Sequence, residues 1–99
     1  MELSLRPRIR AGDPQAFACL FEDHAHAVYG HAVQLTEDRS TAEDVVSLTF
    51  LEAWRLRELL PDAEVSDDAG DGLRAWLFGI ATNVLRNTRR SARRHRAAL

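Results

Sequence analysis

The last third of the chain carries basic side chains that could bind a polyanion. The row consists of Arg86, Arg89, Arg90 and Arg93, with Arg94 at its edge. Their spacing of three and four residues would place them on one side of a helix. No acidic residue follows Asp71, so no carboxylate in this segment neutralises the row. We predict that these arginines bind a phosphate backbone; the alternative is a solvated arginine face without a ligand.

One neutral side chain belongs to the same face. Asn83 lies at the N-terminal end of the arginine row, beside Thr82. A side-chain amide both donates and accepts hydrogen bonds, so it can contact the edge of a base as well as a phosphate. Asn83 is therefore the predicted base-reading residue, unless it only caps local backbone.

A second segment has more apolar surface than one core stripe requires. At helical spacing the core side of this segment holds Val46, Thr49, Phe50 and Ala53, and the opposite side holds Asp44, Ser47, Leu48, Leu51 and Arg55. Two leucines flanked by opposite charges are typical of a surface that binds a protein partner. Burial of these leucines beneath the N-terminal segment or a long loop is the alternative interpretation.

The histidines raise the question of a metal site or an enzyme. His24 and His31 are seven residues apart, and Glu22 and Asp23 are close in sequence, but the set has no recognised ligand spacing. We interpret the two histidines as partly buried polar residues. The chain also contains no phosphate-cradling glycine loop and no nucleophile with a matched base. We expect no metal, no cofactor, no small-molecule substrate and no catalysis.

The composition indicates a single globular domain. Its acidic and basic residues are separated along the chain. An apolar fraction of 45% and a charged fraction of 28% are ordinary for a globular domain. We predict that this domain comprises residues 1–99. Residues 1–72 hold all fifteen acidic residues and six arginines, whereas residues 73–99 hold seven arginines. Cys19 is the only cysteine, and no apolar run is long enough for a membrane span. We expect a cytoplasmic protein.

Two helices are predicted in the first sixty residues. Asp13 and Pro14 are suited to the N-cap and first turn of a helix that continues to about Leu35. Its apolar positions are Phe17, Leu20, Phe21, Val28, Ala32 and Leu35. Ser40 and Glu43 have capping-box spacing and predict a second helix to about Arg57. Residues 1–12 are consistent with a short leading helix.

A third helix is predicted after a long loop. Residues 60–72 show no periodicity and contain Asp62, Glu64, Asp67, Asp68 and Asp71. The helix then runs from about Leu73 to Arg94, with an apolar stripe at Leu73, Trp76, Leu77, Ile80, Ala81, Val84 and Thr88. Since no segment alternates as a strand does, we predict an all-α bundle of three main helices.

Three linked stretches resemble a known family. Ala42–Arg55 resembles the region 2.2 helix of extracytoplasmic-function (ECF) sigma factors of the sigma-70 family, and Leu73–Asn83 resembles their region 2.3 to 2.4 helix. Ala11–Phe17 resembles the usual beginning of the family. The likeness covers nearly the whole chain in the right order. It implies a region 2 domain that takes part in transcription initiation.

The resemblance also implies partners for the predicted surfaces. Asp44, Ser47, Leu48 and Leu51, with Arg55 beside them, would dock on the clamp helices of the β′ subunit of RNA polymerase. Asn83 would contact a base of the promoter −10 element on the non-template strand, and Arg86, Arg89, Arg90 and Arg93 would follow the adjacent backbone. The loop at 60–72 would capture a flipped-out base. An anti-sigma factor would bind the same surfaces, and nothing in the chain corresponds to region 4, which suggests an excised or truncated protein.

The chain departs from the family pattern at two places. Ser47 and Leu48 stand where the family often has Gln-Glu, so the docking surface is less polar. The loop is longer and more acidic than usual, and we expect its carboxylates to screen the arginine row. A protein-interaction module that binds an acidic partner without reading DNA is the alternative function.

Overall fold

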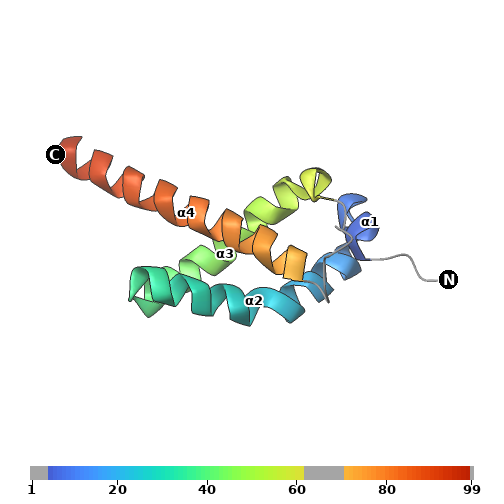
Figure 1. The fold of residues 1–99 in the computed structure, drawn as a ribbon. Coiled ribbons are helices and arrows are strands. Elements are labelled where there is room, and N and C mark those ends of the chain that lie inside the picture. Colours follow the sequence, from blue (N-terminus) through green and yellow to red (C-terminus); the bar gives the residue numbers. More distant parts are fainter. Residues whose placement is uncertain (1–4, 62–70, 99) are drawn as a thin grey trace.

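The computed structural model describes residues 5–61 and 71–98, which form four α-helices and one short 3₁₀ turn (Figure 1). The elements are α1 (Leu5–Arg10), α2 (Pro14–Thr36), α3 (Arg39–Arg55), η1 (Arg57–Leu59) and α4 (Asp71–Ala98). Helices α2, α3 and α4 pack against one another, while α1 packs against α2 and η1. The C-terminal half of α4 extends beyond the other helices. The predicted all-α bundle with a short leading helix is confirmed.

Asp13 determines where α2 begins. Its carboxylate accepts hydrogen bonds from the backbone N–H groups of Gln15 and Ala16, at 3.0 and 3.4 Å. Pro14 follows as the first helical residue, as the sequence predicts. Arg8 Nε donates to the same carboxylate at 2.8 Å, which links α1 to the start of α2. This ion pair, as the main cause, and the cap hydrogen bonds lower the pKa of Asp13.

The capping-box prediction for α3 was wrong. Asp38, rather than Ser40, is the N-cap: its side chain accepts from Ser40 N at 3.2 Å and from Thr41 Oγ1 at 2.5 Å. Glu37 has a left-handed φ of 59° that ends α2, so Asp38 is the first extended residue from which a side chain can reach the next helix.

The helix boundaries also differ from the predicted ones. Helix α3 ends at Arg55 and is followed by η1, whereas α4 begins at Asp71 and continues to Ala98. Residues 62–70 lie outside the described residues. The loop predicted at 60–72 and its predicted roles are therefore untested.

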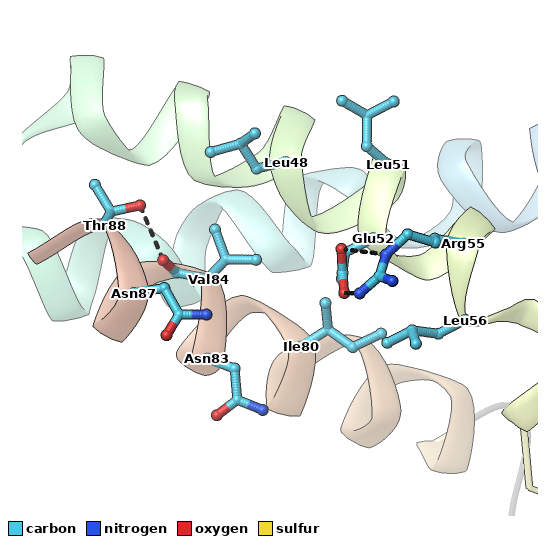
Figure 2. A pocket seen from close by; sticks show the side chains of 10 residues that line it. All are labelled: Leu48, Leu51, Glu52, Arg55, Leu56, Ile80, Asn83, Val84, Asn87 and Thr88. Carbon is cyan, nitrogen blue, oxygen red and sulfur yellow. Dashed lines mark hydrogen bonds and ion pairs between the residues drawn. The ribbon is translucent and has the colours of Figure 1, made fainter. Parts of the chain in front are cut away.

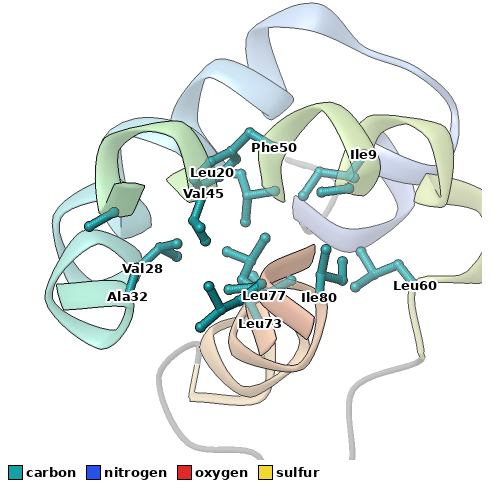
Figure 3. Close-up of a cluster of buried hydrophobic side chains, with 14 of the residues drawn as sticks. Ile9, Leu20, Val28, Ala32, Val45, Phe50, Leu60, Leu73, Leu77 and Ile80 are labelled. Atoms are coloured by element: carbon teal, nitrogen blue, oxygen red, sulfur yellow. The ribbon is translucent and has the colours of Figure 1, made fainter. Parts of the chain in front are cut away.

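The core is one cluster to which every helix contributes (Figure 3). Its members are Ile9, Ala16, Leu20, Val28, Ala32, Ala42, Val45, Phe50, Ala53, Leu60, Leu73, Leu77, Ile80, Ala81 and Leu85. Leu20 and Leu77 are completely buried. Trp76 is partly buried and packs against the cluster, as predicted.

Three positions predicted for the apolar stripes lie outside the core. Phe21 is 45% exposed, although its ring packs edge-on against Phe50. Leu35 is 41% exposed in the last turn of α2. Thr88 is exposed where α4 leaves the bundle, and its hydroxyl donates to the backbone of its own helix. Leu85, which the stripe did not include, is buried instead.

None of the helices within residues 5–61 and 71–98 is both long and apolar enough to cross a membrane.

Candidate nucleic-acid interface

Helix α4 separates apolar and basic side chains onto different sides. Leu77, Ala81 and Leu85 face the bundle and are buried. The exposed set contains Asn83, Arg86, Arg89, Arg90, Arg93 and Arg94. Because the second half of α4 extends beyond its neighbours (Figure 1), the arginine row lies on an open part of the surface.

Arg89 makes a contact that distinguishes it from the other arginines. Its Nη2 atom donates to the backbone carbonyl of Leu35 at 2.8 Å. This carbonyl lies in the last turn of α2, which contains no basic residue of its own. Cations are favourable at helix C-termini, so Arg89 joins the end of α2 to α4. The sequence spacing predicted that Arg89 binds phosphate, as its neighbours do. It did not predict the contact between Arg89 and α2.

Arg89 also lines a shallow groove of about 200 Å³ between α2 and α4. The other lining residues are Leu35, Thr82, Leu85, Arg86 and Arg93. Three of the predicted DNA-binding arginines are therefore gathered around one partly apolar depression.

His31 supports α4 one turn before the arginine row. Its ring stacks on Phe78, with centroids 4.3 Å apart and planes 9° from parallel. Its Nε2 atom lies 3.2 Å from Thr82 Oγ1, and that hydroxyl donates to the Phe78 carbonyl at 2.9 Å. Since the Thr82 proton is used in this way, His31 Nε2 is the donor to Thr82. The stack and the hydrogen bond position the turn that precedes Asn83.

His24 and His31 are not gathered with acidic side chains in the described parts of the chain. His24 lies 8% exposed in the bundle, away from the His31–Phe78 stack along α2. Within the described parts of the chain, no three His, Cys, Asp or Glu side chains come together in a way that could hold a metal ion.

The outward face of α3 is exposed as the periodicity predicts. Asp44, Ser47, Leu48, Leu51 and Arg55 all reach the surface. Leu48 is 44% and Leu51 is 67% exposed, so the described residues do not bury them. The opposite side of α3 contains the buried Thr49, Phe50 and Ala53, with Val46 partly buried.

A groove of about 420 Å³ joins the two predicted surfaces (Figure 2). From α3 it is lined by Leu48, Leu51, Glu52, Arg55 and Leu56, and from α4 by Ile80, Asn83, Val84, Asn87 and Thr88. Asn83 therefore lies on the same groove as the two exposed leucines. Sequence spacing assigned these residues to separate surfaces, because the periodicity of one helix does not show which sides of two helices adjoin.

An ion pair lies within this groove. Arg55 Nε donates to Glu52 Oε2 at 3.1 Å, and a second, shorter contact joins Arg55 Nη2 to Glu52 Oε1. The hydrogen bond from Arg55 lowers the pKa of Glu52, so Glu52 is anionic and its charge is compensated. Glu52 is the one carboxylate among the described residues that line the groove.

Fold and surface together define a class of protein. An all-α bundle that exposes an amide and an arginine row on one helix, with no ion pair to that row among the described residues, has the features of a nucleic-acid-binding domain. The family described as Sigma-70 region 2 matches residues 20–95. The chain belongs to this family, as the three motifs predict.

Similar proteins are named sigma factors. The chain is 39% identical over 83 residues to the ECF RNA polymerase sigma factor SigL of Mycobacterium tuberculosis, covering 84% of this chain and 44% of that protein. It is 33% identical over 91 residues to the ECF RNA polymerase sigma factor BldN of Streptomyces coelicolor, covering 92% of this chain and 32% of that protein. The RNA polymerase sigma factor CarQ of Myxococcus xanthus is 33% identical over 86 residues, or 87% of this chain and 45% of that protein.

The chain spans less than half the length of these relatives. No solved structure matches it.

Sequence reasoning missed two parts of the α3–α4 groove. Asn87 was not selected, although it follows Asn83 by four residues and therefore lies on a neighbouring part of the same helix side. The Glu52–Arg55 pair was also missed, and its three-residue spacing was the available signal.

Proposed function

We propose that this domain acts in transcription initiation by docking on RNA polymerase core and by recognising the promoter −10 element. The observation that best supports this proposal is the position of Asn83. It is exposed at the start of the arginine row and lines a groove between α3 and α4. The family match and the names of the relatives support the same function.

Docking takes place on the outward face of α3. Leu48 and Leu51 supply the apolar contact area, while Asp44 and Arg55 lie on the same face with opposite charges. Removing a well-packed apolar anchor from a protein interface costs about 2 kcal/mol or more. The β′ clamp helices are the proposed partner, and Ser47 and Leu48 make this face less polar than the Gln-Glu that the family often has there.

Recognition takes place on α4. Asn83 hydrogen-bonds to one unstacked base of the non-template strand. The adjacent phosphates are contacted by Arg86, Arg89, Arg90 and Arg93. Unstacking a base costs a few kcal/mol, which contacts in the groove and along the backbone offset. The domain itself makes and breaks no covalent bond, and it works in the cytoplasm where the polymerase is found.

The exposed leucines also favour a second candidate function. Leu48, Leu51 and the arginine row would suit an acidic protein partner such as an anti-sigma factor. Such a module would bind protein without reading DNA. The two functions differ in whether single-stranded DNA binds with a base preference.

The first prediction tests base reading by Asn83. Fluorescence anisotropy would follow binding of a labelled −10 non-template oligonucleotide library to this chain and to Asn83→Ala at several salt concentrations. We expect salt-dependent binding with a base preference that Asn83→Ala reduces about tenfold at one position, since a good amide–base contact is worth about 1–3 kcal/mol.

Gln15→Ala is the matched control, because Gln15 is an exposed amide at the far end of α2. We expect it to leave the preference intact. Binding without any base preference would reduce the arginine row to an electrostatic platform. No binding at low salt, even with the β′ clamp helices supplied, would favour the protein-interaction function.

A further inference from the structure

Helix α1 lies beside η1 (Figure 1) and is fastened to the end of it by two arginines. Arg6 Nη1 donates to the Pro61 carbonyl at 2.6 Å, and Arg10 Nε donates to the Leu60 carbonyl at 2.9 Å. Leu60 and Pro61 are the last described residues before position 62. Cationic side chains are favourable partners for the backbone carbonyls at the end of a helical turn. These two hydrogen bonds are called the α1 clasp below.

The side of α1 that carries the clasp also reaches the core. Ile9 follows Arg6 by three residues and precedes Arg10 directly, and its side chain is completely buried. Leu60 is 3% exposed and belongs to the same hydrophobic cluster as Ile9 (Figure 3). The core therefore holds the side chain of Leu60 while Arg10 holds its carbonyl, and together they fix the backbone at this position.

A further contact joins the turn after α1 to the start of η1. Gly12 has a φ of 83°, and a Cβ atom at this position would lie 3.3 Å from Arg57 Nε. Arg57 donates to the Trp54 carbonyl at 3.0 Å, and its guanidinium lies 4.4 Å from the centre of the Trp54 ring. The turn therefore packs against the first residue of η1, while the clasp holds the two residues that follow the last one.

We propose that Arg6 and Arg10 are positioning residues for base capture, because they fix the backbone at the beginning of the loop predicted at 60–72. The inference rests on the proposed function and on the base-capturing role that the resemblance implies for this loop. The ligand is single-stranded DNA with one unstacked base, and the two arginines act through the backbone of Leu60 and Pro61 rather than by touching the base. The family match begins at residue 20, so α1 lies outside it.

A fixed loop end makes the capture of a base less costly. Ordering the backbone of one additional residue at the moment of binding lowers an affinity roughly tenfold. Because the clasp orders residues 60 and 61 during folding, this cost does not fall on the binding of DNA. Unstacking a base is itself unfavourable, so a site that must also be ordered holds the base less well.

The α1 arginines differ from those of α4 in their surroundings. Arg6 and Arg10 are half-buried and donate to carbonyls of the chain itself. Arg86 and Arg90 on α4 are exposed. We therefore assign the α1 arginines to the start of the loop and the α4 arginines to phosphates.

The second prediction tests the clasp with single-stranded oligonucleotides. Each base of the −10 non-template sequence would be removed in turn to leave an abasic position, and anisotropy would give the affinity of this chain, Arg6→Met, Arg10→Met and the double variant. Methionine keeps an unbranched stem and removes the donor. We expect the double variant to lose roughly tenfold of the affinity that one base contributes. This base should differ from the one affected by Asn83→Ala.

Arg8→Met is the matched control, because Arg8 lies on the same helix and carries the same charge but donates to Asp13. It should lower the stability through loss of this ion pair and leave the contribution of every base intact. Arg10→Lys keeps a donor for the Leu60 carbonyl and should retain most of the contribution that Arg10→Met loses. Circular dichroism and thermal unfolding of each variant would establish that the fold is retained.

The outcomes separate this inference from the proposed function. If every base contributes equally in the parent chain and in the double variant, the clasp has no positioning role while the proposed function stands. Loss of the same contribution in Arg8→Met would also overturn the inference, because any loosening of α1 would then suffice. A fall in affinity that is the same for all oligonucleotides would show that the two arginines act only by their charge. A parent chain without any base preference would overturn the proposed function itself.

Discussion

His24 is a titratable side chain inside the bundle. It is 8% exposed, and its Nδ1 atom has no hydrogen-bond partner among the described residues. Burial, with a smaller contribution from Arg74, lowers the pKa of His24 below its usual 6.5. The folded protein therefore binds fewer protons than the unfolded chain as the pH falls below about 6.5, and folding stability declines there.

The third prediction follows from this proton linkage. His24→Leu should remove the loss of stability between about pH 6.5 and pH 5, since leucine does not titrate. Thermal unfolding at pH 5.5 and 7.5 would measure the change, with the exposed His26→Leu as the control. Equal pH dependence in the parent chain and His24→Leu would contradict the assignment.

At the scale of elements, Arg89 connects two helices whose ends are far apart in the sequence. Its hydrogen bond to the Leu35 carbonyl places a cation at the C-terminus of α2. The neighbouring Arg90 is exposed and has no such contact among the described residues. Two arginines next to each other in the chain thus differ in their part in the fold.

The fourth prediction compares these two arginines, each of which carries one charge. Arg89→Ala should lower the free energy of unfolding by about 0.5–1 kcal/mol through loss of the contact with α2. Arg90→Ala should leave stability within about 0.5 kcal/mol and reduce the salt dependence of DNA binding. Urea unfolding and anisotropy titrations measure the two effects. Equal stability of the two variants would show that the Arg89 contact does not stabilise the bundle.

At the scale of the whole molecule, acidic and basic residues are separated along the chain. Residues 73–99 contain seven arginines and no acidic residue, whereas five carboxylates lie between positions 62 and 71. The carboxylates repel a polyanion and attract the arginines, and both effects oppose binding of the polyanion. Salt screens these Coulomb interactions.

The fifth prediction concerns this charge balance. The five carboxylates are Asp62, Glu64, Asp67, Asp68 and Asp71. Replacing them together with Asn or Gln should raise the affinity for single-stranded DNA at low salt, and the gain should shrink as salt is added. Anisotropy titrations from low to physiological salt would measure it. Unchanged affinity at low salt would contradict the screening hypothesis.

Local physics allowed the helices and the outward faces to be predicted. Asp13 and Pro14 favour a helix start of the kind observed, and the spacing of Leu48 and Leu51 places them opposite the core side of α3 because helical periodicity is local. The family motifs, which are also local, predicted the match over residues 20–95. Predictions failed where two nearby groups compete for one task, as Asp38 and Ser40 do for the N-cap of α3.

Only the tertiary structure decided which surfaces adjoin. The packing of α3 against α4 brings Asn83 and Asn87 onto one groove with Leu48 and Leu51, and the packing of α2 against α4 brings Arg89 to the Leu35 carbonyl. The sequence by itself determined the helices, their charged and apolar sides and the family. It could not determine these contacts, because they join residues more than thirty positions apart, and their formation depends on how the cores of separate helices pack rather than on any local spacing.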